Sequence, residues 1–442
     1  MKIKDILEID FPLLLASLLL TTFGILFIYS SGVTSSGELV STEYTRQIIW
    51  AAAGLVSIVV ISLLNYKRIY DFSLYIYIFI LLLLIYTCIF GRMVSGSRSW
   101  IGMGRWLGIG NFSVQPSEFA KISTILFLAR YLDSTKHSRN GIARFALASA
   151  IVLLPMMIIM IQPDLGTALV FIPILLVMAY IGGIETRYVA FLGGAVVLTS
   201  LMTVLPLWQQ VILRGEFPAL MILMNSRFIL VSILVFSLIA AISYLGNSRY
   251  KKRYFYWICY FAAMLVLSLA TSFFAHKVLR EYQMMRLIVF LDPNVDPRGS
   301  GWHIIQSMTA IGSGGLGGKG FLQGTQSHYR FLPTQSTDFI FSIYTEEWGF
   351  FGGLFVMALF LLICLRLIRL MTTTSDSFGV YIAAGLTAMY AFHFLVNTGM
   401  AMGIMPITGI PLLFMSYGGS ALISAMIGIG LAMSIHVRRF DR

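Results

Sequence analysis

Long apolar runs constrain this chain more than any other feature. A helix that crosses a bilayer needs about 20 mostly apolar residues. Twelve runs of roughly this length recur, near 11–30, 47–65, 71–90, 117–132, 144–161, 165–183, 188–207, 228–245, 254–275, 339–365, 378–396 and 411–435. The sequence is 58% hydrophobic and only 11% charged, which is outside the range of soluble proteins. We expect an all-α polytopic integral membrane protein, whose first run is a retained helix rather than a cleaved signal peptide.

The positive charges predict an orientation. Cytoplasmic loops of membrane proteins carry an excess of lysine and arginine. If the N-terminus is cytoplasmic, more than half of the 31 lysines and arginines fall in short inside segments. We therefore predict that both termini are cytoplasmic. The same rule accounts for the formal net charge of +12 without any binding of nucleic acid.

Most other cations gather in two outer segments. Residues 91–114 contain three arginines and no acid, and residues 276–337 contain six cations against three acids. Such clusters indicate an anionic ligand, although ion pairing with lipid headgroups is an alternative. Residues 276–337 form a long outer loop, in which Tyr282–Leu291 has the pattern of a helix lying in the membrane interface.

Three acids, Glu118, Asp164 and Asp338, lie at outer helix ends under this topology. A carboxylate near a helix N-terminus can simply cap free N–H groups. Three at a common depth, beside a basic and aromatic surface, favour a polar site at the outer membrane boundary. Lys121 follows Glu118 by three residues, a spacing that allows an ion pair with either a structural or a catalytic role.

Two more acids follow Asp338 along the same apolar run. At about 100° per residue, Glu346 lies within about a quarter turn of the Asp338 face, whereas Glu347 points to the opposite side. Glu346 is therefore the better candidate to share a cavity with Asp338. The glycine-rich residues 312–324, which include Lys319, are not a nucleotide P-loop. Their amides could bind an anion or form a packed turn.

Tryptophans mark the same outer segments, at Trp100, Trp106 and Trp302. Tryptophan commonly anchors a helix at the membrane interface, and an aromatic face beside arginines also suits a sugar diphosphate. Neither histidine nor cysteine occurs with the spacing of a metal site in this sequence.

Several longer strings resemble the SEDS family of bacterial membrane proteins. They are Gly-Arg-Trp-Leu-Gly (104–108), Phe-Ser-Val-Gln-Pro-Ser-Glu-Phe-Ala-Lys (112–121), Gln-Pro-Asp-Leu-Gly-Thr-Ala (162–168), Leu-Asp-Pro-Asn-Val-Asp-Pro (291–297), Gly-Ser-Gly-Gly-Leu-Gly-Gly-Lys-Gly (312–320), Thr-Asp-Phe-Ile-Phe (337–341) and Ser-Tyr-Gly-Gly-Ser (416–420). The match covers nearly the whole chain. Residues 324–327, Gly-Thr-Gln-Ser, resemble the rod-shape branch of the family more than its division branch.

The resemblance implies a single SEDS transmembrane domain over residues 1–442, with about ten core spans and the long extracytoplasmic loop at 276–337. Residues 208–275 then look like an inserted pair of spans, and an even number of added spans leaves Asp338 outside. Thr334 and Ser336 stand where family members usually have glutamate and histidine, so the surroundings of Asp338 depart from the family pattern.

The resemblance also implies an activity. Members of the family are peptidoglycan glycosyltransferases of the bacterial cytoplasmic membrane, which polymerise lipid II during cell elongation with a class B penicillin-binding protein and the elongation machinery. By position, Asp338 matches the family's essential aspartate. Trp106, Glu118, Lys121 and Asp164 match residues around its outer cavity.

Glycosyl transfer from a lipid diphosphate needs a base for the acceptor hydroxyl and positive charge for the departing diphosphate. We hypothesise that Asp338 is the base and that Glu346 is a further substrate contact. The candidate diphosphate contacts are Arg98, Arg105, Lys121, Arg286 and Lys319. A divalent cation such as Mg²⁺ or Mn²⁺, held by the acids, is an alternative source of positive charge.

Three other functions remain open from the sequence. A lipid-linked precursor flippase is one, although transporters usually place ionisable groups near the bilayer midplane and often show repeated halves. A scaffold that only recruits a transpeptidase is another, and a division polymerase is the third.

Overall fold

Helices make up nearly all of the fold. The computed structural model describes residues 9–94, 97–102, 113–138, 140–211, 225–278 and 281–440. Ten helices among them are long and apolar enough to cross a membrane, so the chain is a multi-pass membrane protein. The chain divides into two compact units, one of residues 1–184 and 306–442 and the other of residues 185–305.

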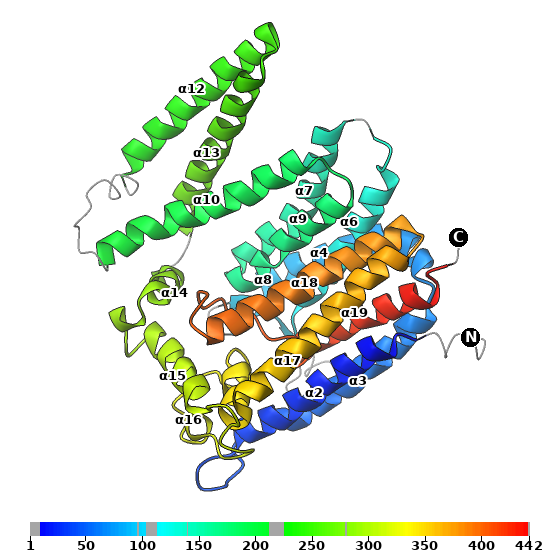
Figure 1. Cartoon of the computed structure of the whole chain (residues 1–442), viewed down its shortest axis with the longest axis vertical. Coiled ribbons are helices and arrows are strands. Elements are labelled where there is room, and N and C mark those ends of the chain that lie inside the picture. Colours follow the sequence, from blue (N-terminus) through cyan, green and yellow to red (C-terminus); the bar gives the residue numbers. More distant parts are fainter. Residues whose placement is uncertain are drawn as a thin grey trace. The chain divides into compact units, whose positions relative to one another are not determined.

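The first unit is a bundle of apolar helices joined by short segments (Figure 1). Its helices are α2 (Phe11–Gly32), α3 (Glu43–Leu63), α4 (Tyr66–Phe90), α6 (Pro116–Ser134), α7 (Gly141–Ile161), α8 (Leu165–Leu169), α9 (Phe171–Ile181), α16 (Thr325–His328), α17 (Ile340–Thr373), α18 (Ser377–Ala401) and α19 (Gly419–Val437). Asp10, Asn140 and Asp376 cap α2, α7 and α18, where each side chain accepts a hydrogen bond from a backbone N–H of the first turn.

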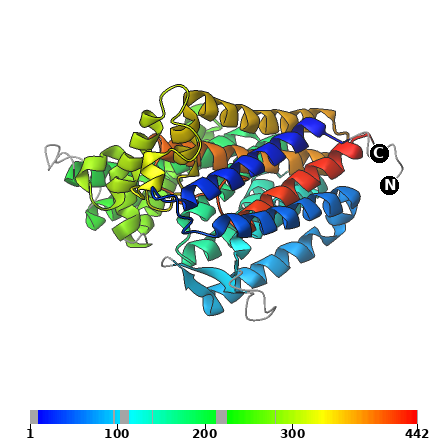
Figure 2. The ribbon, with the colours of Figure 1, turned by 90° about the horizontal axis from the view of Figure 1, so that it is seen from below.

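The core of this unit lies around α18 and α19. Of the ten candidate spans, these two bury the largest share of their apolar stretch. Helix α18 packs against α17, α6 and α9, and α19 packs against α3 and α6. Seen from below, α2, α3 and α19 run side by side (Figure 2). A charged group on α18 or on the facing side of α6 is therefore enclosed by protein rather than by lipid.

Two of the expected spans differ from the prediction. The run 165–183 is divided at Val170 into the short helices α8 and α9. The last run was expected from 411, but α19 begins only at Gly419, because residues 404–412 have no helical turns and Phe414 has a left-handed backbone with φ of 69°. Helix α6 is present where it was expected, although it is not among the ten helices that are long and apolar enough to cross a membrane.

A small antiparallel sheet occupies much of the segment 91–114. Its strands, in the order β1-β2-β3, are β1 (Arg92–Val94), β2 (Ser97–Gly102) and β3 (Ser113–Val114). Arg92 pairs with Trp100, and Ile101 pairs with Val114. The sequence predicts only a basic outer loop here, so the sheet is an addition to that prediction.

The second unit contains α10 (Thr186–Val211), α12 (Ser226–Tyr250), α13 (Arg253–Val278), α14 (Glu281–Leu291) and the 3₁₀ turn η2 (Pro293–Val295); the chain leaves it within α15 (Ser300–Ser313). Helices α12 and α13 match the runs expected near 228–245 and 254–275, and α14 matches the helix expected at Tyr282–Leu291. Hydrogen bonds between Thr203 and Ser272, and from Ser268 to the Ala195 carbonyl, join α10 to α13.

Helix α17 contains a break that fixes its first turns. Gly349 has φ of 66° and ψ of −164°, which is not helical. The carbonyls of Glu346 and Glu347 instead accept hydrogen bonds from the amides of Lys319 and Gly320, at 3.1 and 2.9 Å. The glycine-rich segment thus completes the backbone hydrogen bonding of the broken helix.

Backbone amides of α17 also donate hydrogen bonds to the glycine-rich segment. The amides of Phe350 and Phe351 donate to the carbonyls of Gly315 and Leu316, at 2.9 and 3.3 Å. Gly318 lies so close that a Cβ there would stand 2.1 Å from the Glu347 carbonyl oxygen. Glycine is therefore required for this approach of two backbones.

Candidate functional site

Two of the candidate acids and the candidate lysine meet at the start of α6. Lys121 Nζ donates to Glu118 Oε2 at 2.8 Å, as expected for residues three apart on a helix. Gln115, at the N-cap of α6, donates from its side-chain amide to Asp164 Oδ2 at 2.9 Å. Glu118 and Lys121 are almost completely buried, with exposed fractions of 2% and 1%. A buried charge pair of this kind is held in one geometry by its surroundings.

Lys121 has a second partner that the sequence did not indicate. Its Nζ lies 3.0 Å from Nε2 of His393 on α18, and His393 Nδ1 lies 3.1 Å from the carbonyl oxygen of Pro411. A carbonyl oxygen accepts only, so Nδ1 carries the proton and Nε2 accepts from the lysine. The Glu118 backbone carbonyl also accepts a hydrogen bond from the hydroxyl of Ser424 on α19.

Asp164 caps a helix, which is one of the two roles that the sequence left open. It is the N-cap of α8, where Oδ1 accepts from the Thr167 amide at 3.1 Å and Oδ2 accepts from the Thr167 hydroxyl at 2.9 Å. Burial raises the pKa of the Asp164 carboxyl above its usual range, and the hydrogen bonds from Thr167 oppose that shift. The charge of Glu118 raises this pKa further and that of Lys121 lowers it, which places Asp164 in the same electrostatic environment.

Asp338 lies in the turn before α17 and is partly exposed. Its amide donates to the carbonyl of Thr334 at 3.1 Å, and Thr334 takes a left-handed backbone with φ of 47°. The Asp338 carbonyl accepts from the Asn397 side-chain amide at 2.9 Å. The N-cap position of α17 belongs to Phe339, so capping by position does not explain the acid. Both backbone polar groups of Asp338, its amide and its carbonyl, thus have a hydrogen-bond partner.

Neighbouring segments hold this turn from two further sides. The Ser336 carbonyl accepts from the Tyr417 amide at 2.8 Å. The Gln335 side chain donates to the carbonyl of Ser31, at the end of α2, at 2.8 Å. Ser336, one of the two departures from the family pattern, therefore takes part through its backbone.

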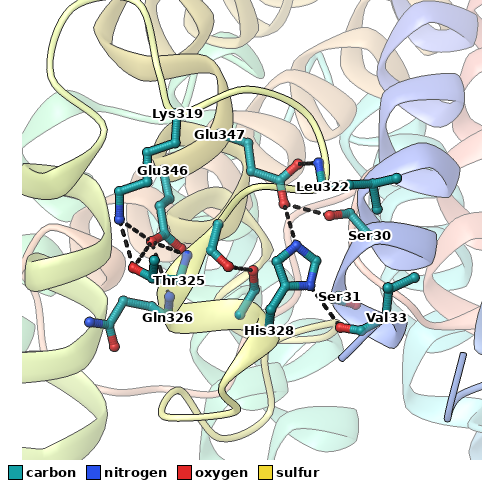
Figure 3. Close-up of polar contacts among 12 residues, drawn as sticks. Ser30, Ser31, Val33, Lys319, Leu322, Thr325, Gln326, His328, Glu346 and Glu347 are labelled. Carbon is teal, nitrogen blue, oxygen red and sulfur yellow. Dashed lines mark hydrogen bonds and ion pairs between the residues drawn. The ribbon is translucent and has the colours of Figure 1, made fainter. Parts of the chain in front are cut away.

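Glu346 and Lys319 form an ion pair with each other (Figure 3). Glu346 Oε1 accepts from Lys319 Nζ at 2.7 Å and from the amides of Thr325 and Gln326 at 2.9 and 3.0 Å. Its side chain has no exposed surface. The described hydrogen bonds of Glu346 are thus with the segment 313–326, and they anchor that segment to α17.

Glu347 contacts α2 and α16 in addition to the segment 313–326 (Figure 3). Its Oε1 accepts from the hydroxyl of Ser30 on α2, and its Oε2 accepts from the Leu322 amide at 3.0 Å. His328 Nε2 lies 3.8 Å from the same carboxylate, and His328 Nδ1 donates to the Val33 carbonyl at 2.8 Å. Two adjacent glutamates therefore join three parts of the first unit.

The glycine-rich segment binds anionic groups of its own chain. In the described residues its amides donate hydrogen bonds to the Glu347 carboxylate and to the carbonyls of Glu346 and Glu347 in α17. Of the two readings that the sequence left open, the packed turn is the one that these contacts support.

The remaining candidates are not brought to the acids by any described contact. Trp106 and Arg105 lie outside the described residues. Arg98 is exposed on β2. Arg286 belongs to α14 in the second unit. Burial of His303 lowers the pKa of that ring below its usual range, and the positive charge of Arg286 lowers it further. Among the residues that the structure describes, no group of three histidines, cysteines or acids could hold a metal ion.

His393 and Asn397 are the residues that sequence reasoning missed. Both are polar side chains within an otherwise apolar spanning helix. Such side chains usually face a bundle interior and often mark a functional site. That signal was present in the run 378–396 and its C-terminal neighbours, whereas the partners lie up to 272 residues away in sequence.

Sequence comparison finds relatives over almost the whole chain. A profile of the family described as cell cycle protein, FtsW/RodA/SpoVE, matches residues 11–214 and 218–440. The peptidoglycan glycosyltransferase RodA of Treponema pallidum (strain Nichols) is 51% identical over 442 residues, covering 99% of this chain and 100% of that protein. The peptidoglycan glycosyltransferase MrdB of Escherichia coli (strain K12) is 32% identical, covering 98% of this chain and 95% of that protein.

Structural comparison finds the same fold. A chain of the structure described as "Structural coordination of polymerization and crosslinking by a peptidoglycan synthase complex" superposes with a TM-score of 0.66 at 26% identity, covering 98% of this chain and 99% of that chain. The rod shape determining protein RodA of Thermus thermophilus gives a TM-score of 0.60 at 22% identity, with 98% of each chain covered.

Proposed function

Because this chain belongs to the FtsW/RodA/SpoVE family of cell cycle proteins, we propose that it is a peptidoglycan glycosyltransferase that polymerises lipid II during cell elongation. The full-length likeness to proteins named as peptidoglycan glycosyltransferases carries this proposal. The buried charges of the first unit support it, since charged groups among membrane helices are costly to bury and usually mark a functional site.

We place the protein in the bacterial cytoplasmic membrane, with both termini cytoplasmic. The distribution of lysine and arginine supports this orientation. The turn 333–339 and the start of α6 then face the extracytoplasmic side, where a lipid-linked disaccharide is available for polymerisation. In this topology the twelve helical segments, with α8 and α9 counted as one, return the C-terminus to the inside. Helices α12 and α13 would be an inserted pair that leaves the sidedness of α17 unchanged.

The proposed reaction has one base and one leaving group. The Asp338 carboxylate takes the proton of the acceptor 4-hydroxyl while that oxygen attacks the anomeric carbon of the donor sugar. The new C–O bond forms as the bond to the diphosphate breaks, so the diphosphate leaves with the electron pair and the configuration inverts. Positive charge near the departing oxygen stabilises the transition state.

Lys121 is the candidate cation that the contacts favour for this role. It lies beside Glu118 and within the electrostatic reach of Asp164. It is also buried, with an exposed fraction of 1%, and an ammonium in a buried site interacts more strongly with an anion than it does in water. Lys319, which pairs with Glu346 in a different cluster, remains a further candidate contact. Arg98, Arg105, Arg286 and Trp106 remain candidate contacts for the substrate outside this cluster.

We also propose a class B penicillin-binding protein as the partner. The structural neighbour from a peptidoglycan synthase complex, described as coordinating polymerization and crosslinking, supports this assignment. Such a partner would crosslink the glycan strands that this chain makes.

Polymerisation of purified lipid II tests the base assignment. Asp338→Asn should lower the rate of glycan-chain formation about 100-fold or more, since a general base contributes at least that factor. Asp376→Asn is the matched control, because Asp376 caps α18 and asparagine caps as well as aspartate. Each protein is assayed with its partner, with and without a chelator, which measures any need for a divalent cation.

The assay also separates the rival functions. Glycan chains cannot arise from transport alone, so chain formation by the wild-type protein excludes a pure flippase. Chain formation at the wild-type rate by Asp338→Asn would refute the base assignment. Unchanged synthesis without this chain, when only the partner is present, would support a scaffold instead.

A further inference from the structure

Among the buried polar side chains of helix α18, His393 and Asn397 lie one turn apart. Residues four apart on a helix project from the same face. Their exposed fractions are 1% and 0%. A polar side chain buried without hydrogen-bond partners costs free energy, so the contacts of this pair decide what the face does.

One set of contacts is with the backbone of the segment before α19. His393 Nδ1 donates to the Pro411 carbonyl at 3.1 Å, and Asn397 Nδ2 donates to the Ile410 carbonyl at 2.8 Å. These carbonyls belong to neighbouring residues of a stretch without helical hydrogen bonds. The two side chains therefore grip one short piece of backbone from the same helix face.

The other set of contacts reaches the two groups that the proposed reaction needs. His393 Nε2 accepts from Lys121 Nζ at 3.0 Å. Asn397 Nδ2 donates to the Asp338 carbonyl at 2.9 Å. The two N–H groups of the Asn397 amide are then both used, one for each carbonyl, so its orientation is fixed.

We propose that His393 and Asn397 are positioning residues, which hold the Lys121 ammonium and the Asp338 backbone on one rigid helix face. Each side chain donates a hydrogen bond to a carbonyl of residues 410–411. Each also forms a hydrogen bond with one of the two candidate reactive residues, Lys121 or Asp338. The distance between the Lys121 ammonium and the Asp338 backbone is thereby set by one turn of α18. This inference rests on the proposed function, because it assigns the roles of Lys121 and Asp338 within that reaction.

The proton arrangement makes the His393 role specific. Its ring must donate at Nδ1 and accept at Nε2, which only the neutral tautomer with the proton on Nδ1 can do. Lys121 is then directed by two acceptors, Glu118 Oε2 and His393 Nε2, at 2.8 and 3.0 Å. An ammonium held by two acceptors has one donor left, which points in a fixed direction.

Two substitutions at His393 separate positioning from packing. A glutamine amide oxygen reaches about as far as Nε2 and can accept from Lys121. An asparagine amide nitrogen reaches about as far as Nδ1 and can donate to Pro411 but cannot reach Lys121. We expect His393→Gln to keep most of the wild-type kcat and His393→Asn to lower kcat by about ten- to a hundred-fold, with KM changed by less than about twofold.

A third variant tests the other half of the pair. Asn397→Leu keeps the approximate volume but removes both donated hydrogen bonds, and kcat should again fall more than KM changes. Each variant is compared with the wild type by its melting temperature in detergent and by its elution as a single species. These measurements exclude loss of folding as the cause of a lower rate.

Each outcome tests a different part of the proposal. His393→Asn more active than His393→Gln would show that the clamp on Pro411 is what matters, and would overturn the proposed link to Lys121. Wild-type kcat in Asn397→Leu would overturn the link to Asp338. A wild-type protein that makes no glycan chains would overturn the proposed function, and this inference with it.

Discussion

Glu346 shows how the local sequence can indicate a buried acid but not its use. Its helical spacing from Asp338 suggested a shared cavity. In the structure its Oε1 instead accepts hydrogen bonds from Lys319 and from two consecutive amides, Thr325 and Gln326. A carboxylate with several charge-assisted hydrogen bonds is a strong anchor. Whether Glu346 also contacts substrate stays a prediction.

Replacing Glu346 should reveal the anchor through stability. In Glu346→Ala the amides of residues 325 and 326 and the partly exposed Lys319 ammonium lose their acceptor, which should cost about 2 kcal/mol for lost hydrogen bonds to a charged group. Glu346→Gln keeps an acceptor oxygen and should lose less. The measurement is the melting temperature of each protein in detergent. Equal melting temperatures for the alanine variant and the wild type would contradict the anchoring role.

His303 predicts an acid sensitivity in the second unit. Burial lowers its pKa, and the charge of Arg286 lowers it further. The folded state therefore prefers the neutral ring, so its contribution to stability is full above the unfolded pKa of about 6.5. That contribution decreases as the pH falls below this value towards the lower folded pKa, because the unfolded chain then binds the proton more readily.

The matched substitution is His303→Gln, which cannot titrate. Between about pH 7 and pH 5, a window that brackets the usual histidine pKa, the wild-type melting temperature should fall more than that of the variant. A parallel decrease in both proteins would show that other groups cause the acid sensitivity.

At the scale of elements, the break in α17 lets the glycine-rich segment form hydrogen bonds with the backbone of the helix. Gly349 has a left-handed φ, and a Cβ there would lie 2.3 Å from the Gly318 amide nitrogen. The positions of Glu346 and Glu347 follow from this break, because their carbonyls and carboxylates both contact the segment 313–326. A straight α17 would not offer these carbonyls to the loop.

Alanine at Gly349 should therefore be poorly tolerated. Strain at a positive φ and the close contact together should cost about 2 kcal/mol or more, seen as a lower melting temperature. Gly312→Ala is the control, since that glycine lies in α15 and a Cβ there meets nothing within 4 Å. If the two alanine variants melt together, the break does not depend on glycine.

At the scale of the whole molecule, the two units should differ in their independence. The contacts described within the first unit include those of α6 and α18 with each other and with α19. We expect a chain whose residues 212–278 are replaced by a short linker to keep the hydrogen exchange of α6 and α18 unchanged. Exchange is measured by mass spectrometry on peptides from these helices. Faster exchange throughout α6 and α18 would show that the first unit depends on α12 and α13.

The sequence predicted the helical class and the position of most spans, because apolar length is a local property. It also predicted the Glu118–Lys121 pair, whose spacing of three residues is local too. It could not predict that His393 would meet Lys121, or that Asn397 would hold the Asp338 backbone. Those contacts depend on how α18 packs against α6 and α17, which no local pattern in one sequence encodes.

The interlocked backbones of α17 and the segment 313–326 have a mechanical consequence. Withdrawing the segment would leave four backbone groups of the helix, at residues 346, 347, 350 and 351, without their partners at once. Any rearrangement of this end of α17 during a catalytic cycle must therefore move the helix end and the segment together as one rigid body.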